Sequence, residues 1–182
     1  MAAMDSLATL FEDELRDVYD AERQIVKALP KMIKAAANAE LRSALEAHLE
    51  ETREQVERLD QVFSTLDLRA RGKHCAGMAG ILEEGKDLME ADGDEAVLDA
   101  GYIAAAQRVE HYEITAYGTL IAWAETLGHR SVASLLQATL DEEKAANQKL
   151  SALAESSVNA IAAQRGGQKE EEKPRTRTAG RR

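Results

Sequence analysis

The sequence is poor in several residue types and lacks some common segments, and these shortages exclude several classes of protein. It contains one cysteine, two prolines and 4% aromatic residues. Because Cys75 has no second cysteine to pair with, an internal disulfide is excluded and a cytoplasmic location is the default expectation. The first ten residues lack the basic segment and apolar stretch of a signal peptide. No apolar run approaches the roughly 20 residues that a membrane-spanning helix needs.

The residue types that are abundant favour a helical globular protein. Alanine, leucine, glutamate and arginine dominate, and these side chains lose little freedom in a helix. A length of 182 residues suits one domain with a sizeable core. The net charge of −10 repels phosphate backbones, so we expect no nucleic-acid binding through the main surface.

Apolar residues recur at alternating steps of three and four residues, which predicts amphipathic helices. Asp5 is a candidate N-cap for the first helix, Asn38 marks the first turn, and Gly128 is a candidate C-cap before the last helix. The four long segments with this pattern are 4–37, 40–66, 95–127 and 131–162.

The connections between these segments predict how the helices are arranged. The first two helices are joined tightly, and so are the last two, whereas residues 67–94 form a long link with five glycines. Met78, Ile81 and Leu82 within this link indicate a short amphipathic helix. We therefore predict an all-α, ferritin-like antiparallel four-helix bundle over residues 1–163, with a long crossover connection that carries a short extra helix. Residues 164–182 have no periodicity and are basic, so we expect a disordered tail.

The two predicted hairpins resemble each other at an offset of 91 residues. Glu22 then corresponds to Glu113, and Glu51 to Glu142. In an antiparallel hairpin, residues equally far from the turn lie at the same height. Each hairpin therefore offers two facing glutamates, and packing the hairpins together brings four carboxylates to the centre of the bundle.

Carboxylates on otherwise apolar seams predict a metal site. A buried, unpaired carboxylate is costly, and these seams carry no basic residues to pair with it. Hard cations suit carboxylate oxygens, and an imidazole adds a preference for iron, zinc or manganese. We predict two metal ions per chain, with iron favoured and manganese or zinc as alternatives. The candidate ligands are Glu22, His48, Glu51, Glu110, Glu113 and Glu142.

The order of these ligands departs from the usual di-iron pattern, in which two helices each carry Glu-x-x-His. The second helix carries His48-x-x-Glu51, and the fourth carries no histidine three residues after Glu142. Glu110 is a candidate replacement for the missing ligand. Glu143 can exchange roles with Glu142, and this choice stays open.

Four motifs resemble the YciE/YciF family of bacterial ferritin-like proteins. They are ELRDVYDAE at 14–22, HLEET at 48–52, RVEHYE at 108–113 and LDEEK at 140–144, and the likeness extends to about Ala163. The resemblance implies a rubrerythrin-like bundle that forms a homodimer, binds metal between its helices and takes part in stress responses.

Two functions of different classes follow from these observations. The first is a cytoplasmic di-metal stress protein that oxidises ferrous iron or reduces oxygen or peroxide. The alternative is a structural or interaction protein of the stress response whose metal site is vestigial. Nucleic-acid binding is expected only through the basic tail, and no membrane association is expected.

Overall fold

The computed structural model describes residues 4–171, with side chains described up to residue 165. All regular elements in this part of the chain are helical. No helix among these residues has the combined length and apolarity that crossing a membrane requires. In chain order the elements are α1 (Leu7–Ala35), α2 (Ala39–Thr65), α3 (Ala76–Met89), α4 (Glu95–Thr126), α5 (Arg130–Leu153), the π-helical turn η1 (Ala154–Val158) and α6 (Asn159–Glu171).

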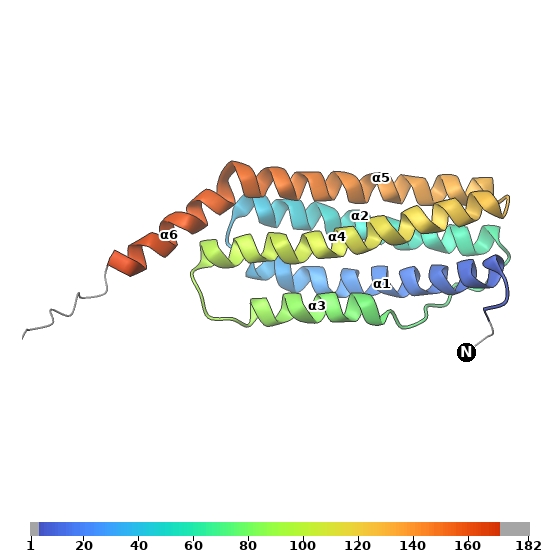
Figure 1. Ribbon diagram of the computed structural model, residues 1–182, viewed down its shortest axis with the longest axis horizontal. Helices are drawn as coiled ribbons and strands as arrows, with labels where there is room; N and C mark the ends of the chain where they lie inside the picture. Colours follow the sequence, from blue (N-terminus) through green and yellow to red (C-terminus); the bar gives the residue numbers. More distant parts are fainter. Residues whose placement is uncertain (1–3, 172–182) are drawn as a thin grey trace, which may run out of the picture.

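Four long helices form the predicted bundle. Helices α1 and α2 make one hairpin and α4 and α5 make the other, and the hairpins pack through contacts of α1 with α4 and of α2 with α5. Figure 1 shows these helices lying along one common axis. The all-α fold and the bundle with one crossover connection are therefore confirmed.

The helix ends are fixed by local hydrogen bonds. The N-cap of α1 is Ser6 and not Asp5, since the Ser6 hydroxyl accepts a hydrogen bond from the backbone N–H of Thr9. Asn38 caps α2 in the same way. Gly128 follows the end of α4 with a φ of +82°, a conformation in which a glycine avoids the clash that a side chain would cause. The tight turns predicted at Asn38 and Gly128 are thus present.

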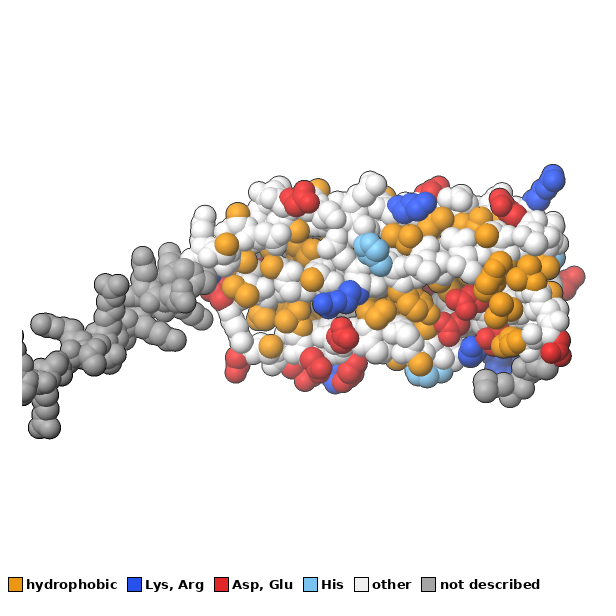
Figure 2. Space-filling view, viewed as in Figure 1, with side chains coloured by type: hydrophobic (Ala, Val, Ile, Leu, Met, Phe, Trp, Pro, Cys, Tyr) orange, Lys and Arg blue, Asp and Glu red, His pale blue; other side chains and the backbone are white. Residues whose placement is uncertain are grey.

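The crossover connection is held along α1 before α3 begins. The backbone N–H of Lys73 donates to the carbonyl of Arg16 over 2.9 Å, and the N–H of Cys75 donates to Asp20 Oδ2 over 2.9 Å. Helix α3 then packs against α1 and α4. Its outer face is acidic, and Figure 2 shows the acidic side chains gathered over it. The extra helix of the crossover is therefore an amphipathic cover on one side of the bundle.

The C-terminal region differs from the sequence expectation. The fourth long helix was expected to end near residue 162, but α5 ends at Leu153 and the wider turn η1 leads into α6, which continues to Glu171. Figure 1 shows α6 leaving the bundle at an angle. The predicted tail at 164–182 thus begins within a helix, and residues 172–182 lie outside the described residues.

The buried interior has two hydrophobic clusters with a polar layer between them. One cluster includes Ile25, Leu45 and Ile103, and the other includes Leu15, Leu59 and Leu120. Burial of each such side chain contributes about 1.5–3 kcal/mol relative to exposure. The two clusters make the bundle rigid on both sides of the polar layer, which is the feature that concerns function.

Candidate metal centre

Eight buried polar side chains form the layer at mid-bundle. They come from four helices and occupy positions on the inward face of each one. Their exposure is 7% for His48 and 1% or less for the others. These residues are Glu22 from α1, His48, Thr52 and Gln55 from α2, Glu110 and Glu113 from α4, and Thr139 and Glu143 from α5.

Four of these side chains bring ligand atoms together at one point. His48, Glu110, Glu113 and Glu143 each offer one atom, and all of these atoms lie within 4.8 Å of one another. Nε2 of His48 lies 3.4 Å from Oε1 of Glu110. Glu110 and Glu113 share one face of α4 because they are three residues apart. One nitrogen and at least three oxygens are therefore available to a single cation.

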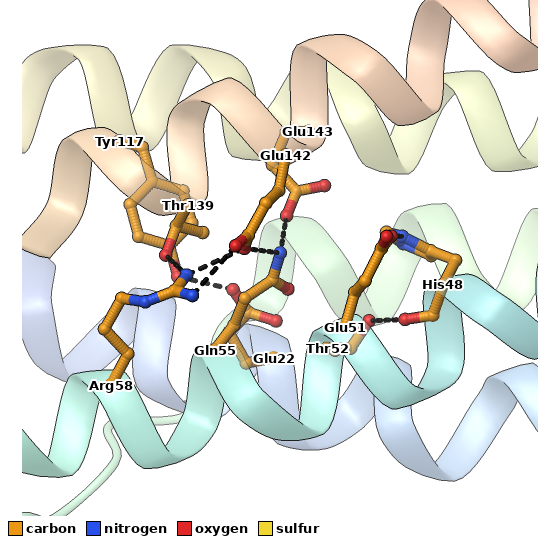
Figure 3. Close-up of polar contacts among 10 residues, drawn as sticks. All are labelled: Glu22, His48, Glu51, Thr52, Gln55, Arg58, Tyr117, Thr139, Glu142 and Glu143. Atoms are coloured by element: carbon orange, nitrogen blue, oxygen red, sulfur yellow. Dashed lines mark hydrogen bonds and ion pairs between the residues drawn. The ribbon is translucent and has the colours of Figure 1, made fainter.

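Glu22 extends this group on the side of α1. The phenol of Tyr117 donates a hydrogen bond to Oε1 of Glu22, while Oε2 has no hydrogen-bond partner. Figure 3 shows Tyr117 beside Glu22 and shows Gln55 beside Glu143. The amide of Gln55 donates to Oε1 of Glu143, so each of these two carboxylates keeps one oxygen bonded and one oxygen free.

The unpaired atoms of this layer are of the kind that could serve as ligands to a cation. Buried polar atoms are nearly always hydrogen-bonded, because leaving one unpaired costs about 1–3 kcal/mol. Among the described residues, every buried side-chain atom without a partner belongs to this one layer. The atoms are Glu22 Oε2, both ring nitrogens of His48, Gln55 Oε1, Glu110 Oε2, both carboxylate oxygens of Glu113, and Glu143 Oε2.

Burial also disfavours negative charge in this layer. Desolvation, followed by the charge of Glu143, raises the pKa of Glu22 to about 8. Desolvation and the hydrogen bond and charge of Glu143 raise the pKa of Glu110 to about 10. Burial raises the pKa of Glu113 and Glu143 as well. At neutral pH the carboxyl groups of Glu22 and Glu110 therefore favour the protonated form unless a cation supplies the balancing charge.

The donor set can be compared with that of di-metal helical bundles. Di-metal bundles take a glutamate from each of two helices and a Glu-x-x-His pair from each of the other two. Here α1, α4 and α5 supply glutamates, but the corresponding pair on α2 is replaced by Thr52 and Gln55. The hydroxyl of Thr52 is occupied, since it donates to the carbonyl of His48 over 2.7 Å. On α2 the nitrogen donor is instead His48, one turn before Thr52, and Glu110 on α4 lies 3.4 Å from it.

Glu142 is placed differently from the sequence prediction. Its two oxygens accept hydrogen bonds from Nη1 and Nη2 of Arg58 over 2.7 and 2.8 Å, and Arg58 also donates to Thr139 over 2.7 Å. Of the two candidates on α5, the structure thus brings Glu143 into the layer and holds Glu142 outside it in a two-point ion pair. The physical reason is the register of α5, whose buried seam runs through Leu136, Thr139 and Glu143.

Glu51 lies at the rim of the layer and not inside it. Its side chain is 50% exposed, and its Oε2 lies 3.8 Å from Nδ1 of His48. It lines a groove of about 310 Å³ between α2 and α5, together with His48, Glu110 and Glu142. Glu51 can therefore attract a cation to the layer or serve as an outer ligand through a movement of its side chain.

Gln55 is the residue of the layer that sequence reasoning missed. It is completely buried, and its amide donates to both Glu143 and Glu142. Its position continues the buried steps of four and three along α2, from His48 to Thr52 to Gln55. This spacing is the sequence signal that indicates Gln55 as a buried residue of the layer.

Known proteins resemble the chain over almost all of its described length. The profile of the family described as "Domain of unknown function (DUF892)" matches residues 6–163. The protein YciF of Escherichia coli is 46% identical over 157 residues, which cover 86% of this chain and 95% of YciF.

Solved structures support the same relationship. The crystal structure of the stress protein YciF matches with a TM-score of 0.83, covering 86% of this chain and 99% of that one. YcfI of Rhodopseudomonas palustris, for which a structural role has been suggested, matches with 49% identity and a TM-score of 0.80, covering 83% and 98%. A protein of Xanthomonas campestris, 20% identical with a TM-score of 0.71, shares the fold over 88% and 99%.

The resemblance that the four sequence motifs indicated is therefore confirmed. The matched region contains the whole bundle and every residue of the polar layer. The chain belongs to the DUF892 family, together with the stress protein YciF.

Proposed function

We propose that this protein binds two metal ions in the polar layer, iron or manganese in preference to zinc, and acts in a stress response by oxidising ferrous iron or reducing dioxygen or peroxide. The observation that carries the proposal is the cluster of His48, Glu22, Glu110, Glu113 and Glu143 with its unpaired ligand atoms. The stress role comes from YciF. A homodimer and a cytoplasmic location, which the resemblance and the composition predict, belong to the same proposal.

The layer divides into two ends that share carboxylates. His48 and Glu110 belong to the group whose ligand atoms lie within 4.8 Å of one another, whereas Glu22 lies outside this group. Glu143 raises the pKa of both Glu22 and Glu110 through its charge, so it lies within electrostatic reach of both ends. The charges of Glu22 and Glu110 in turn raise the pKa of Glu113, so Glu113 also lies within electrostatic reach of both. Glu113 and Glu143 are therefore the candidates to contact both ions.

Carboxylates and one imidazole favour hard or intermediate cations. When bound, two ferrous ions supply the two electrons that reduce dioxygen to hydrogen peroxide, or hydrogen peroxide to water. Four ionised glutamates balance the charge of two divalent cations. This pairing offsets the free-energy cost of burying the charged carboxylates.

Neighbouring residues hold the ligands in place. Tyr117 fixes one oxygen of Glu22, and Gln55 fixes one oxygen of Glu143. Arg58 keeps Glu142 at the rim, where with Glu51 it makes the groove between α2 and α5 acidic. Such a groove attracts cations from solution toward His48 and Glu110.

A structural role without metal is the second candidate, and the raised pKa values favour it. With the pKa of Glu22 at about 8 and that of Glu110 at about 10, both carboxyl groups can stay neutral in a metal-free bundle. The structural role suggested for YcfI agrees with this alternative. Metal content separates the two candidates.

The test is elemental mass spectrometry of the purified protein before and after anaerobic addition of ferrous iron. We expect about two ions per chain, in line with the two-metal sites of such bundles. Glu143→Gln should lose at least one ion, whereas Glu142→Gln, the adjacent control, should keep both. Because Glu143→Gln removes a buried acid, it should still fold. Equal metal binding by the two variants, or no uptake by the wild type, would refute the proposal.

A further inference from the structure

A second opening reaches the polar layer from the side covered by α3. It is a cavity of about 40 Å³ between α1, α3 and α4, and we call it the α3 cavity. Met32 of α1, Leu82 and Gly85 of α3, and Ala106 and Val109 of α4 are among its lining residues. His48 and Glu110 also line it, so the cavity borders the cluster of candidate ligands.

The lining determines which molecules can occupy this space. Apart from His48 and Glu110, every lining residue is apolar or glycine. A water molecule takes about 10–15 Å³ of such volume and needs two to four polar partners. The cavity therefore has room for a molecule of two or three atoms, but its apolar part offers water and hydrogen peroxide no hydrogen bonds. It suits a small apolar molecule.

We infer that the α3 cavity binds dioxygen and delivers it to the metal centre at His48 and Glu110. This inference rests on the proposed function and narrows it, because it assigns the apolar oxidant to one opening and leaves cations and peroxide to the polar groove between α2 and α5. It also gives the crossover helix a role. Leu82 and Gly85 of α3 form part of the wall of the cavity.

Gly85 allows the cavity to be filled selectively. A Cβ atom added at Gly85 would meet Ala105 Cβ and Met32 Cε, both at 3.7 Å, which is ordinary contact. Gly85→Ala should therefore fold normally, and Gly85→Val should place two further methyl groups in the cavity. Gly80 lies on the exposed side of the same helix with nothing within 4 Å of an added Cβ, so Gly80→Val is the matched control.

The first measurement uses xenon as a probe of the metal-free protein. Apolar cavities bind xenon without needing any cation. Xenon NMR, or diffraction from crystals under xenon pressure, should show one atom beside Gly85 in the wild type and in Gly80→Val. Gly85→Val should weaken this binding about tenfold or more, and Gly85→Ala should have a smaller effect of the same sign, because the added atoms occupy the same space. Absence of xenon from the wild-type cavity would overturn the inference.

The second measurement compares two oxidants in the iron-loaded protein. Stopped-flow absorbance should show oxidation by dioxygen slowed several-fold in Gly85→Val, with oxidation by hydrogen peroxide unchanged and Gly80→Val like the wild type. Equal dioxygen rates in the two variants would overturn the inference while the proposed function stands. Failure of the wild type to take up iron would instead refute the proposed function, and with it the role of dioxygen, even if xenon binds.

Discussion

The metal-free protein should lose stability as the pH rises from 5 to 7. Carboxyl groups whose pKa is raised by burial keep their protons in the folded state, while the unfolded chain releases them above about pH 4.5. Folding then takes up protons, so a higher pH favours the unfolded chain. The stabilising effect of protonation is complete below pH 4.5 and is lost progressively toward pH 8 for Glu22 and pH 10 for Glu110.

The size of this effect follows from the number of protons. Each proton taken up on folding lowers the free energy of unfolding by about 1.4 kcal/mol for every unit by which the pH rises. With Glu22 and Glu110 both protonated between pH 5 and 7, the loss is about 5 kcal/mol, a large part of the 5–15 kcal/mol that typically stabilises a domain. The raised pKa of Glu113 and of Glu143 acts in the same direction.

Urea unfolding followed by helical circular dichroism, in the presence of a chelator at pH 5, 6 and 7, measures this loss. Glu110→Gln removes one proton from the balance, so its stability should fall less steeply, by about 1.4 kcal/mol per pH unit. Saturation with metal should abolish most of the dependence, because the ionised form is then the bound form. A metal-free wild type whose stability does not change over this range would refute the buried carboxylate cluster.

Four further substitutions test how the frame holds the site, each by urea unfolding of the metal-free protein. Gly128→Ala should destabilise it by about 1 kcal/mol or more because φ is +82°, whereas Gly118→Ala, in the open interior of α4, should stabilise it by up to about 1 kcal/mol. Asp99→Ala should cost about 2–4 kcal/mol, because this buried carboxylate accepts two backbone N–H groups of the α1–α2 turn. Tyr117→Phe should cost about 1–3 kcal/mol by removing the donor to Glu22, and because this hydrogen bond lowers the pKa of Glu22, its loss should extend the pH dependence to higher pH. Effects of the opposite sign would contradict these assignments.

The fold could be predicted from the sequence because local sequence patterns indicate where each helix begins, runs and ends. The apolar steps of three and four, the caps at Asn38 and Gly128 and the long crossover between the hairpins are all visible in the chain. The packing of the crossover helix could not be predicted, since its amphipathic pattern does not specify which pair of helices it covers. Its place on α1 and α4 creates the α3 cavity and so depends on tertiary structure.

On two helices the buried residue of the polar layer is the neighbour of the predicted ligand. Glu22, His48, Glu110 and Glu113 lie in the layer, whereas Glu51 lies at its rim. Adjacent residues on a helix point about 100° apart, so a shift of one position moves a side chain from the core to the surface. The 91-residue repeat pairs Glu51 with Glu142, and on both helices the buried position is the next one along the chain, Thr52 on α2 and Glu143 on α5.

The sequence does not single out the residues that complete the layer, and the reason is chemical. Among the four glutamates and aspartates from Asp141 to Glu155, and among those around Glu51, only burial distinguishes a ligand from a solvated side chain. A search for carboxylates does not find an uncharged residue such as Gln55. A strict extension of the α2 seam, from His48 to Thr52 and onward by three, finds it.

The most direct test of the metal centre is anomalous diffraction from crystals of the protein loaded with iron or manganese, recorded at the absorption edge of that metal. We predict two anomalous peaks within the polar layer, one beside His48 and Glu110 and one beside Glu22, with Glu113 and Glu143 contacting both. Peaks found only at the rim, near Glu51 and Glu142, or no peak at all in a loaded crystal, would contradict the account.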